Sequence, residues 1–249
     1  MINFFRKIRR QFADQNKPLK YLRYAVGEIF LVMVGILLAL QVNNWNEGRK
    51  GQIELRNIFQ SIVDDIKQNQ YFLEQDRKFY VEENKRIKAF LNHDDYTGFN
   101  RDSLENGLET EVMKSSWRGA GYQNLRQSGI TEYGKYTAVV EYITYYYENT
   151  IFWQKDYEIR LEKRMHKSDE FWRYEQDSYE FNYVKGLRTL QNDETATVIL
   201  NRLLKSPIPR NILKIAYRSQ ENQIQRYDQL EEMHNGILEA IEDVLKEDG

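Results

Sequence analysis

Residues of the types that bind metals or act as catalytic nucleophiles are few in this sequence. Among its 249 residues are three histidines and no cysteine, which excludes disulfides, thiolate metal sites and cysteine nucleophiles. Glu231-x-x-His234 has the spacing of one half of a carboxylate di-iron site. A complete site needs a second such motif and two further glutamates, and neither His93 nor His166 has a glutamate three positions before it. We therefore expect no bound metal and no cofactor.

The other stretches that resemble catalytic motifs are also incomplete. His93-Asp94-Asp95 stands in a loop-like stretch and lacks further oxygen ligands at the spacing of a cation site. No G-x-S-x-G, P-loop or G-x-G-x-x-G pattern occurs. The densest aromatic cluster comprises Tyr145, Tyr146, Tyr147, Phe152 and Trp153. These rings could stack on sugars or peptides, but their helical spacing is more typical of core residues. The sequence therefore favours a protein that is not an enzyme.

An acid at the head of an apolar run has the most unusual surroundings of any charged residue. Glu28 directly precedes residues 29–40, which are uninterruptedly apolar. A carboxylate within a membrane-spanning segment is a functional candidate, because its charge is costly there. In that role Glu28 would meet a partner helix or lipid headgroups. The alternative is an interfacial glutamate that reaches the membrane surface and pairs with Lys20 or Arg23.

Length and composition indicate that the apolar run spans a membrane. Extended to residues 24–42, it has 19 residues and would be about 28 Å long as a helix, close to the roughly 30 Å hydrocarbon core of a bilayer. Its eleven Leu, Ile, Val and Phe side chains favour insertion by about 3 to 7 kcal/mol. An acid at the centre would cost about 3 kcal/mol, and Glu28 lies near the end, where the cost is smaller. The balance favours insertion.

The flanking residues favour a membrane anchor over two alternatives. Tyr21, Tyr24 and Trp45 lie where interfacial aromatic residues are expected. A soluble core helix would show a polar face, which residues 29–40 lack. A cleaved signal peptide is the stronger alternative, but 28 residues precede the run and no convincing small-x-small cleavage site follows it. We therefore predict a transmembrane helix over residues 24–42.

The distribution of basic residues predicts the orientation of this helix. Residues 1–23 contain seven cations and one acid, whereas only Arg49, Lys50 and Arg56 follow the span closely. The positive-inside rule therefore places the N-terminus in the cytoplasm and the rest of the chain in the periplasm, with the anchor in the inner membrane. Acids outnumber cations after residue 23, which argues against binding to nucleic acid.

The first residues of the chain predict a second contact with the membrane. On a helix, Phe4, Ile8 and Phe12 would share one face, while Arg9 and Arg10 would lie among the cations on the rest of the surface. Such a basic amphipathic helix suits a bilayer with anionic lipid headgroups. The alternative is a solvated basic tail that only sets the topology.

Small residues on one face of the span suggest helix association. Gly27, Gly35 and Ala39 recur at multiples of four, and Gly35-x-x-x-Ala39 would let two helices approach closely. Because such pairs also arise by chance, a homodimer and contact with another membrane protein both stay open. The predicted membrane and partner contacts are Phe4, Ile8, Arg9, Arg10, Phe12, Gly27, Glu28, Gly35, Ala39 and Trp45.

Helical periodicity continues beyond the anchor. In residues 52–91, apolar residues recur at alternating steps of three and four, and the same register passes through Asn69, Asp76 and Glu83. This pattern predicts a stalk helix with a coiled-coil-like apolar seam that is softened by polar residues.

The remaining periodic segments predict further helices. The expected elements are a loop at residues 92–100, a short helix from Asp102 or Ser103 to about Lys114, another ending at Gly129, a long helix from Thr131, an irregular or short extended stretch at residues 170–186, a helix capped by Asn192 or Asp193, and a last long helix after Pro209. The expected buried face of the helix from Thr131 is Tyr136, Val140, Ile143, Tyr147, Ile151, Tyr157 and Leu161. That of the last helix is Leu213, Tyr217, Ile224, Tyr227, His234, Leu238, Ile241 and Leu245.

These elements predict an all-α protein in which an N-terminal transmembrane helix leads into a long stalk helix and an antiparallel helical bundle. We expect residues 1–23 to be a basic amphipathic cytoplasmic segment, residues 24–42 the transmembrane helix, and residues 43–249 a periplasmic stalk and bundle.

The stretch YLRYAVGEIFLVMVGILLALQVNNWNE, residues 21–47, resembles the signature of a family of uncharacterised single-pass inner-membrane proteins of Gram-negative bacteria. That signature reads Y-A-x-G-E-I and then A-L-Q-x-N-N-W-N-E. A second block, AGYQNLRQSGI with YITYYYE downstream, is similar to the central stretch of the same family. The resemblance implies a membrane anchor and supplies no activity.

Two functions are consistent with this organisation. The first is a membrane-anchored, non-enzymatic protein whose extracytoplasmic helical bundle binds a partner or ligand. The alternative is a sensor-like bundle that signals across the membrane, which would need a separate partner because the cytoplasmic part is so short.

Overall fold

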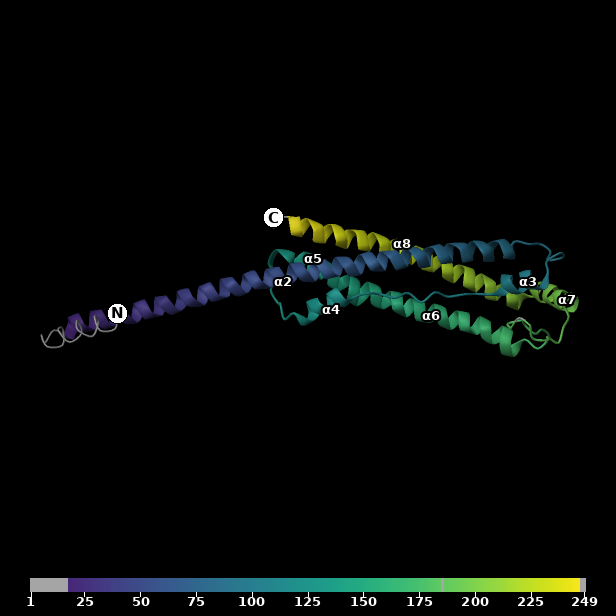
Figure 1. Cartoon of the computed structure of the whole chain (residues 1–249), viewed down its shortest axis with the longest axis horizontal. Helices are drawn as coiled ribbons and strands as arrows, with labels where there is room; N and C mark the ends of the chain where they lie inside the picture. The colour runs from purple at the N-terminus through teal and green to yellow at the C-terminus, as the bar shows by residue number, and fades with distance from the viewer. Residues whose placement is uncertain (1–17, 185, 247–249) are drawn as a thin grey trace. The chain divides into compact units, whose positions relative to one another are not determined.

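The computed structural model describes residues 18–184 and 186–246, and every regular element in these ranges is a helix (Figure 1). The predicted all-α class is confirmed, with a long N-terminal apolar helix followed by a helical bundle. Contacts divide the chain into two units, Met1–Asn57 and Ile58–Gly249. The bundle is formed by the second unit.

The longest element is α2, Pro18–Leu91, which has 74 residues. A proline suits its first turn, because an N–H group there has no partner within the helix. The helix expected over residues 52–91 is confirmed, and it continues the apolar segment without a break. In the bundle, its predicted apolar positions are buried: Phe59, Ile62, Ile66, Leu73, Tyr80, Ile87 and Phe90. Asn69 and Asp76, in the same register, are buried as well.

A second long helix, α8 (Pro207–Lys246), runs antiparallel to the bundle part of α2. The direction follows from two hydrogen bonds between the helices. Gln70 donates to Asn235 over 2.8 Å and Arg77 to Asp228 over 2.7 Å, so the sequence number rises on one helix as it falls on the other.

A third long helix, α6 (Ile151–Glu170), is also antiparallel to α8. Arg226 donates to Gln154 over 2.9 Å, and the Tyr157 hydroxyl donates to the carbonyl of Ser219 over 2.8 Å. The antiparallel arrangement expected for the bundle thus appears in α8, which is antiparallel to both α2 and α6 (Figure 1).

The helix expected to end near Lys114 is much shorter than predicted. α3, Arg101–Leu108, begins after Asn100, whose side chain accepts from the amide of Ser103 over 2.8 Å. Residues 109–119, here called the extended segment, form no helix and run alongside the bundle to α4, Ala120–Gln127 (Figure 1). The predicted boundary was wrong because side chains of other helices bind the backbone of these residues.

Two wide helical turns interrupt the central helix. The helix expected from Thr131 begins later and is built from η1 (Gly134–Tyr136), α5 (Thr137–Tyr145), the π-helix η2 (Tyr146–Thr150), α6 and the π-helix η3 (Phe171–Glu175). A π-turn holds an extra residue and shifts the register of the side chains after it. At the start of η2, Tyr146 is buried where Tyr147 was expected, and Tyr147 is half-buried.

The C-terminal part follows the prediction more closely. The irregular stretch expected at residues 170–186 begins later, because α6 and η3 continue to Glu175, and it comprises residues 176–184 and 186–192 of the described chain. α7, Asp193–Leu204, begins after Asn192, whose side chain accepts from the amide of Thr195. The buried stripe of α8 is Leu213, Ala216, Gln220, Gln223, Tyr227, Leu230, His234, Ile237 and Ile241. The expected Tyr217, Ile224, Leu238 and Leu245 are only half-buried, because each is at the edge of this stripe.

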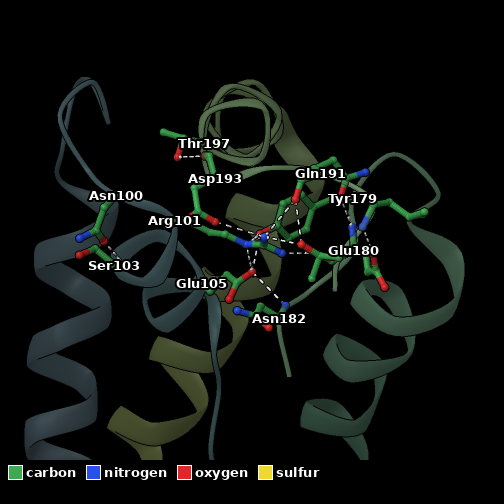
Figure 2. A network of polar contacts seen from close by, with 12 residues as sticks. Asn100, Arg101, Ser103, Glu105, Tyr179, Glu180, Asn182, Gln191, Asp193 and Thr197 are labelled. Atoms are coloured by element: carbon green, nitrogen blue, oxygen red, sulfur yellow. Dashed lines mark hydrogen bonds and ion pairs between the residues drawn. The ribbon is translucent and has the colours of Figure 1, made fainter. Parts of the chain in front are cut away.

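A buried arginine joins α3 to the irregular residues before α7 (Figure 2). The Arg101 side chain is 4% exposed and donates to Glu105 over 2.9 Å and to the hydroxyl of Tyr179 over 3.1 Å. It also donates to the carbonyl of Glu180 over 2.8 Å and to the hydroxyl of Thr189 over 3.0 Å. Burial raises the pKa of Tyr179, and the hydrogen bond to Glu105 adds to the effect. One guanidinium thus fixes segments about 80 residues apart.

Replacing Arg101 by alanine should destabilise the bundle strongly. The change leaves Glu105, whose side chain is 10% exposed, buried without its cation, and breaking such a pair typically costs about 3–5 kcal/mol. The measurement is thermal unfolding of the full chain in detergent, followed by its helical circular dichroism. Arg160→Ala is the matched control, since its pair with Asp156 is half-exposed and is expected to contribute less than about 1 kcal/mol. Equal losses in the two variants would contradict the role of Arg101.

Candidate functional site

The apolar segment of α2 exposes its large side chains. Ile29, Leu31 and Val42 are 68%, 67% and 64% exposed, and none of the most apolar 18-residue window is buried. With a mean hydropathy of 2.3 there, α2 is long and apolar enough to cross a membrane. A core helix of a globular domain would be largely buried, so that alternative does not fit this segment.

The predicted contact residues of the anchor lie on this exposed part of α2. Glu28 is half-buried and lines one hollow together with Arg23, Tyr24 and Gly27. A Cβ atom added at Gly27 or Gly35 would meet nothing within 4 Å, so both glycines leave open space beside the helix. Ala39 and Trp45 are exposed, with Trp45 at 70%.

The predicted amphipathic residues Phe4, Ile8, Arg9, Arg10 and Phe12 lie outside the described residues. Homodimerisation through the small residues and contact with lipid headgroups therefore stay predictions.

Within the bundle, polar side chains of α2 bind the main chain of the extended segment. The Asn69 amide donates to the carbonyl of Arg118 over 3.0 Å and accepts from its N–H over 2.7 Å. The Tyr80 hydroxyl in the same way donates to the carbonyl of Met113 over 3.2 Å and accepts from its N–H over 3.0 Å. As residue numbers fall along α2 they rise along the segment, so the two run antiparallel.

The start of α4, directly after the extended segment, approaches α2 more closely still. Asp65 accepts from the amide of Gly121 over 2.7 Å. A Cβ atom at Gly121 would lie 2.6 Å from the backbone nitrogen of Ile62, so only glycine fits there. One of the two glycines of the stretch WRGAGYQ, residues 117–123, is thus required by this close approach.

The hydroxyl of Ser115 lies at the centre of an interior polar cluster. Its Oγ is 2.8 Å from Asp76 Oδ2 and 2.8 Å from the Tyr227 hydroxyl. On the α6 side, Glu158 accepts from Gln154 over 2.8 Å and from the indole of Trp117 over 3.4 Å. Burial raises the pKa of both Asp76 and Glu158. The extended segment therefore places hydrogen-bond donors against two partly desolvated carboxyl groups.

A buried histidine lies further along α8. His234 is fully buried, and its Nε2 is 2.6 Å from the hydroxyl of Tyr146, the first residue of η2. Its Nδ1 has no hydrogen-bond partner among the described residues. Burial lowers the pKa of His234 to about 4, so the ring is neutral at physiological pH. Glu231 is exposed, so the E-x-x-H spacing does not bring its two members to one site.

The other motifs are also placed in ordinary structural surroundings. The His93 ring packs edge-on against Phe99, with centroids 4.9 Å apart, and Asp95 lies 3.6 Å from the ammonium of Lys205. His166 lies 3.8 Å from Glu170 on the surface of α6. Within residues 18–184 and 186–246, no three His, Asp or Glu side chains converge in a way that could hold a metal ion.

The aromatic cluster is divided between core and surface. Tyr146 is buried, and Tyr147 stacks on Tyr122 with ring centroids 4.8 Å apart. Tyr145, Phe152 and Trp153 are 57%, 58% and 55% exposed. The expectation that most of these rings lie in the core was therefore wrong, since three of the five are exposed.

The residues that bind the extended segment were visible in the sequence only in part. The polar positions Asn69 and Asp76 stood out in the apolar register of residues 52–91, but nothing in the sequence indicated what they bind. Nothing in the sequence marked Asp65 or Glu158 as a binding residue, since acidic residues are common on helices and are ordinarily expected at the surface.

Residues 28–95 match the model of a family described as a Family of unknown function (DUF6090). The match covers all but the first four residues of the predicted span 24–42, the rest of α2 and the four residues after it, and it carries no activity. No curated protein and no solved structure matches the chain.

The buried imidazole should make the fold sensitive to mild acid. In the unfolded chain His234 takes up a proton below pH 6.5, whereas the folded state resists until about pH 4. Stability should therefore be lost as the pH falls from 6.5 to 4, by about 3 kcal/mol in total. Asp76 and Glu158, with raised pKa values, act in the opposite direction over part of this range.

The contribution of His234 is isolated by comparison with His234→Gln in thermal melts of the full chain between pH 7 and 4.5. The variant should melt at a lower temperature than the parent at pH 7, and the difference between the two melting temperatures should become smaller as the pH falls. His166→Gln is the control, because that exposed ring should leave the pH dependence unchanged. If the difference in melting temperature between the parent and His234→Gln does not change with pH, His234 is not the cause of the acid sensitivity.

Proposed function

We propose that the chain is a single-pass membrane protein without catalytic activity, whose helical bundle binds a partner. The observation that carries the proposal is that no residue of the apolar stretch 24–42 of α2 is buried. Exposed apolar side chains on this scale are unfavourable in water, at roughly 25 cal/mol per Å². The same side chains are favourable in the hydrocarbon core of a bilayer, and a helix over residues 24–42 is long enough to cross that core.

The proposed orientation has the N-terminus in the cytoplasm. Seven cations precede residues 24–42, and this excess favours retention of residues 1–23 on the cytoplasmic side. Residues 43–249 would then be periplasmic, with the anchor in the inner membrane of a Gram-negative cell. The basic start of the chain would contact anionic lipid headgroups.

Partner binding is proposed because the described residues that resemble catalytic motifs lie in unrelated surroundings. His234 is bound to Tyr146, Glu231 is exposed, and His93 packs on Phe99. The bundle instead offers exposed apolar rings and a surface that binds an extended backbone. Either a second copy of the chain or another membrane protein could associate through Gly27, Gly35 and Ala39.

A second candidate function is signalling across the membrane through a separate partner. It is favoured by the continuity of α2, which has no helix break between residues 24–42 and the bundle. A continuous helix can transmit a rotation or shift of its axis from one end to the other.

Charged substitutions in the apolar segment should release the protein from membranes. Leu31→Arg with Leu37→Arg adds about 5–7 kcal/mol to the cost of insertion, enough to offset the apolar contribution. The double variant should appear in the soluble fraction after alkaline carbonate extraction, whereas the parent should stay in the pellet. Ile159→Arg is the control, since this residue of α6 is 52% exposed in the bundle.

The orientation is tested on the parent chain. An alkaline phosphatase fused to the C-terminus should be active, and an inactive fusion would overturn the orientation.

Glu28→Gln tests whether the acid of the anchor has a partner. If Glu28 contacts another protein, removing its charge should change the set of co-purifying proteins while membrane insertion stays intact. The measurement is mass spectrometry of crosslinked complexes from parent and variant, with carbonate extraction as the control for insertion. An unchanged set would leave Glu28 as an interfacial residue only.

A further inference from the structure

The extended segment is bound from three sides by side chains of the long helices. α2 lines one side with hydrogen-bonding groups, α6 another with carboxylates, and α8 contributes the hydroxyl of Tyr227. The segment-binding surface, as we name it, consists of Asn69, Asp76, Tyr80, Glu158, Glu162 and Tyr227. All of it lies within the bundle.

Two residues of the segment-binding surface bind main-chain atoms of the extended segment. Asn69 and Tyr80 each bind both the N–H and the carbonyl of one residue, Arg118 and Met113 respectively. Every non-proline residue offers these two groups, so this part of the surface would bind any extended chain of suitable spacing. Recognition through main-chain hydrogen bonds is how proteins commonly bind extended peptides.

The acidic residues of the segment-binding surface instead bind side chains of the segment that donate hydrogen bonds. Lys114 Nζ lies 2.7 Å from Glu162, the Ser115 hydroxyl 2.8 Å from Asp76, and the Trp117 indole nitrogen 3.4 Å from Glu158. Three carboxylates therefore face an ammonium, a hydroxyl and an indole N–H. Carboxylates at these positions favour a donor-rich ligand and disfavour an acidic one.

The extended segment contributes little to the core that it covers. None of residues 109–119 is buried, whereas Leu108 at one end and Gly121 at the other are. Met113 is 37% exposed and the Lys114 side chain 76%. The segment is held mainly by hydrogen bonds to buried side chains of the helices and has no buried side chain of its own, and regions with few buried apolar contacts open locally at the lowest cost.

We infer that the segment-binding surface is a docking site for an extended, donor-rich segment of a partner protein, and that residues 109–119 occupy it as an internal ligand. The partner segment would carry a cation, a hydroxyl and an aromatic N–H donor at the spacing of Lys114, Ser115 and Trp117. The inference rests on the proposed partner-binding function and gives that partner a chemistry. Its tests are made in detergent, so their outcome is independent of whether α2 anchors the chain in a membrane.

Hydrogen exchange of the unaltered full chain in detergent micelles is the first test. The amides of Met113 and Arg118 should exchange much faster than the α2 amides of Tyr80 and Asn69, to which their residues are bound, because the segment opens while the helices stay folded. Exchange of all four amides at one common rate would mean that the segment leaves only on global unfolding, and the inference would be wrong.

Peptide competition is the second test. A fluorescent peptide with the sequence TEVMKSSWRG, residues 110–119, is titrated against the full chain and against the triple variant Lys114→Ala, Ser115→Ala, Trp117→Ala. The variant weakens only the internal ligand and leaves the segment-binding surface intact. It should bind the peptide at least about tenfold more tightly than the parent, because a larger fraction of its sites is open.

Two controls define the site. A peptide with alanine at the same three positions should not bind the triple variant. Adding Glu158→Gln to the triple variant should reduce its increase in peptide affinity over the parent. Equal affinity of parent and triple variant for the peptide would overturn the inference. If the triple variant loses its helical circular dichroism, the hydrogen-exchange result on the parent decides.

Discussion

An extended backbone that lies against helices cannot satisfy its amide and carbonyl groups as a strand in a sheet does. Each of those groups loses free energy if it is taken from water without a partner. In this bundle the partners are side chains, and α2 supplies most of them at positions that would otherwise be apolar. Asn69 and Tyr80 each satisfy both groups of one residue, and Asp65 satisfies a third amide. The polar interruptions in the apolar register of α2 follow from this requirement.

The same requirement shapes the rest of the interior. Once Asp76 and Glu158 are partly buried, their charges need donors, and Ser115, Trp117 and Gln154 provide them. Gln220 and Gln223 on α8 are fully buried, and their amides have no hydrogen-bond partner among the described residues. These two amides are therefore an exception to the requirement, because buried polar groups without partners reduce stability.

The features that sequence reasoning could predict are those that depend on local periodicity. The long helix α2 and the cap at Asn192 follow from spacing and residue type, as does the presence of an irregular stretch before α7, although its predicted start at residue 170 was too early. The end of α3 does not, because residues 109–114 contain no helix breaker, and their backbone is bound by side chains of α2 that are distant in sequence, such as Tyr80, 33 positions from Met113. The π-turn η2 is equally hidden, and its first residue, Tyr146, makes a hydrogen bond to His234 on a helix that is distant in sequence. Of the site, Asn69 and Asp76 were visible as exceptions to a pattern, but their ligand was not.

The π-turns have a consequence for how this chain can change in length. An α-helix advances by about 100° per residue, so one inserted residue would normally rotate everything after it away from the core. η2 and η3 each accommodate an extra residue within a widened turn, and α6 between them keeps Leu161 and Met165 buried. The widened turns therefore separate the register of α6 from that of α5 and of the chain that follows. Among relatives of this chain, single-residue insertions and deletions should accordingly concentrate at η2 and η3, where each would convert a wide turn to a regular one or the reverse.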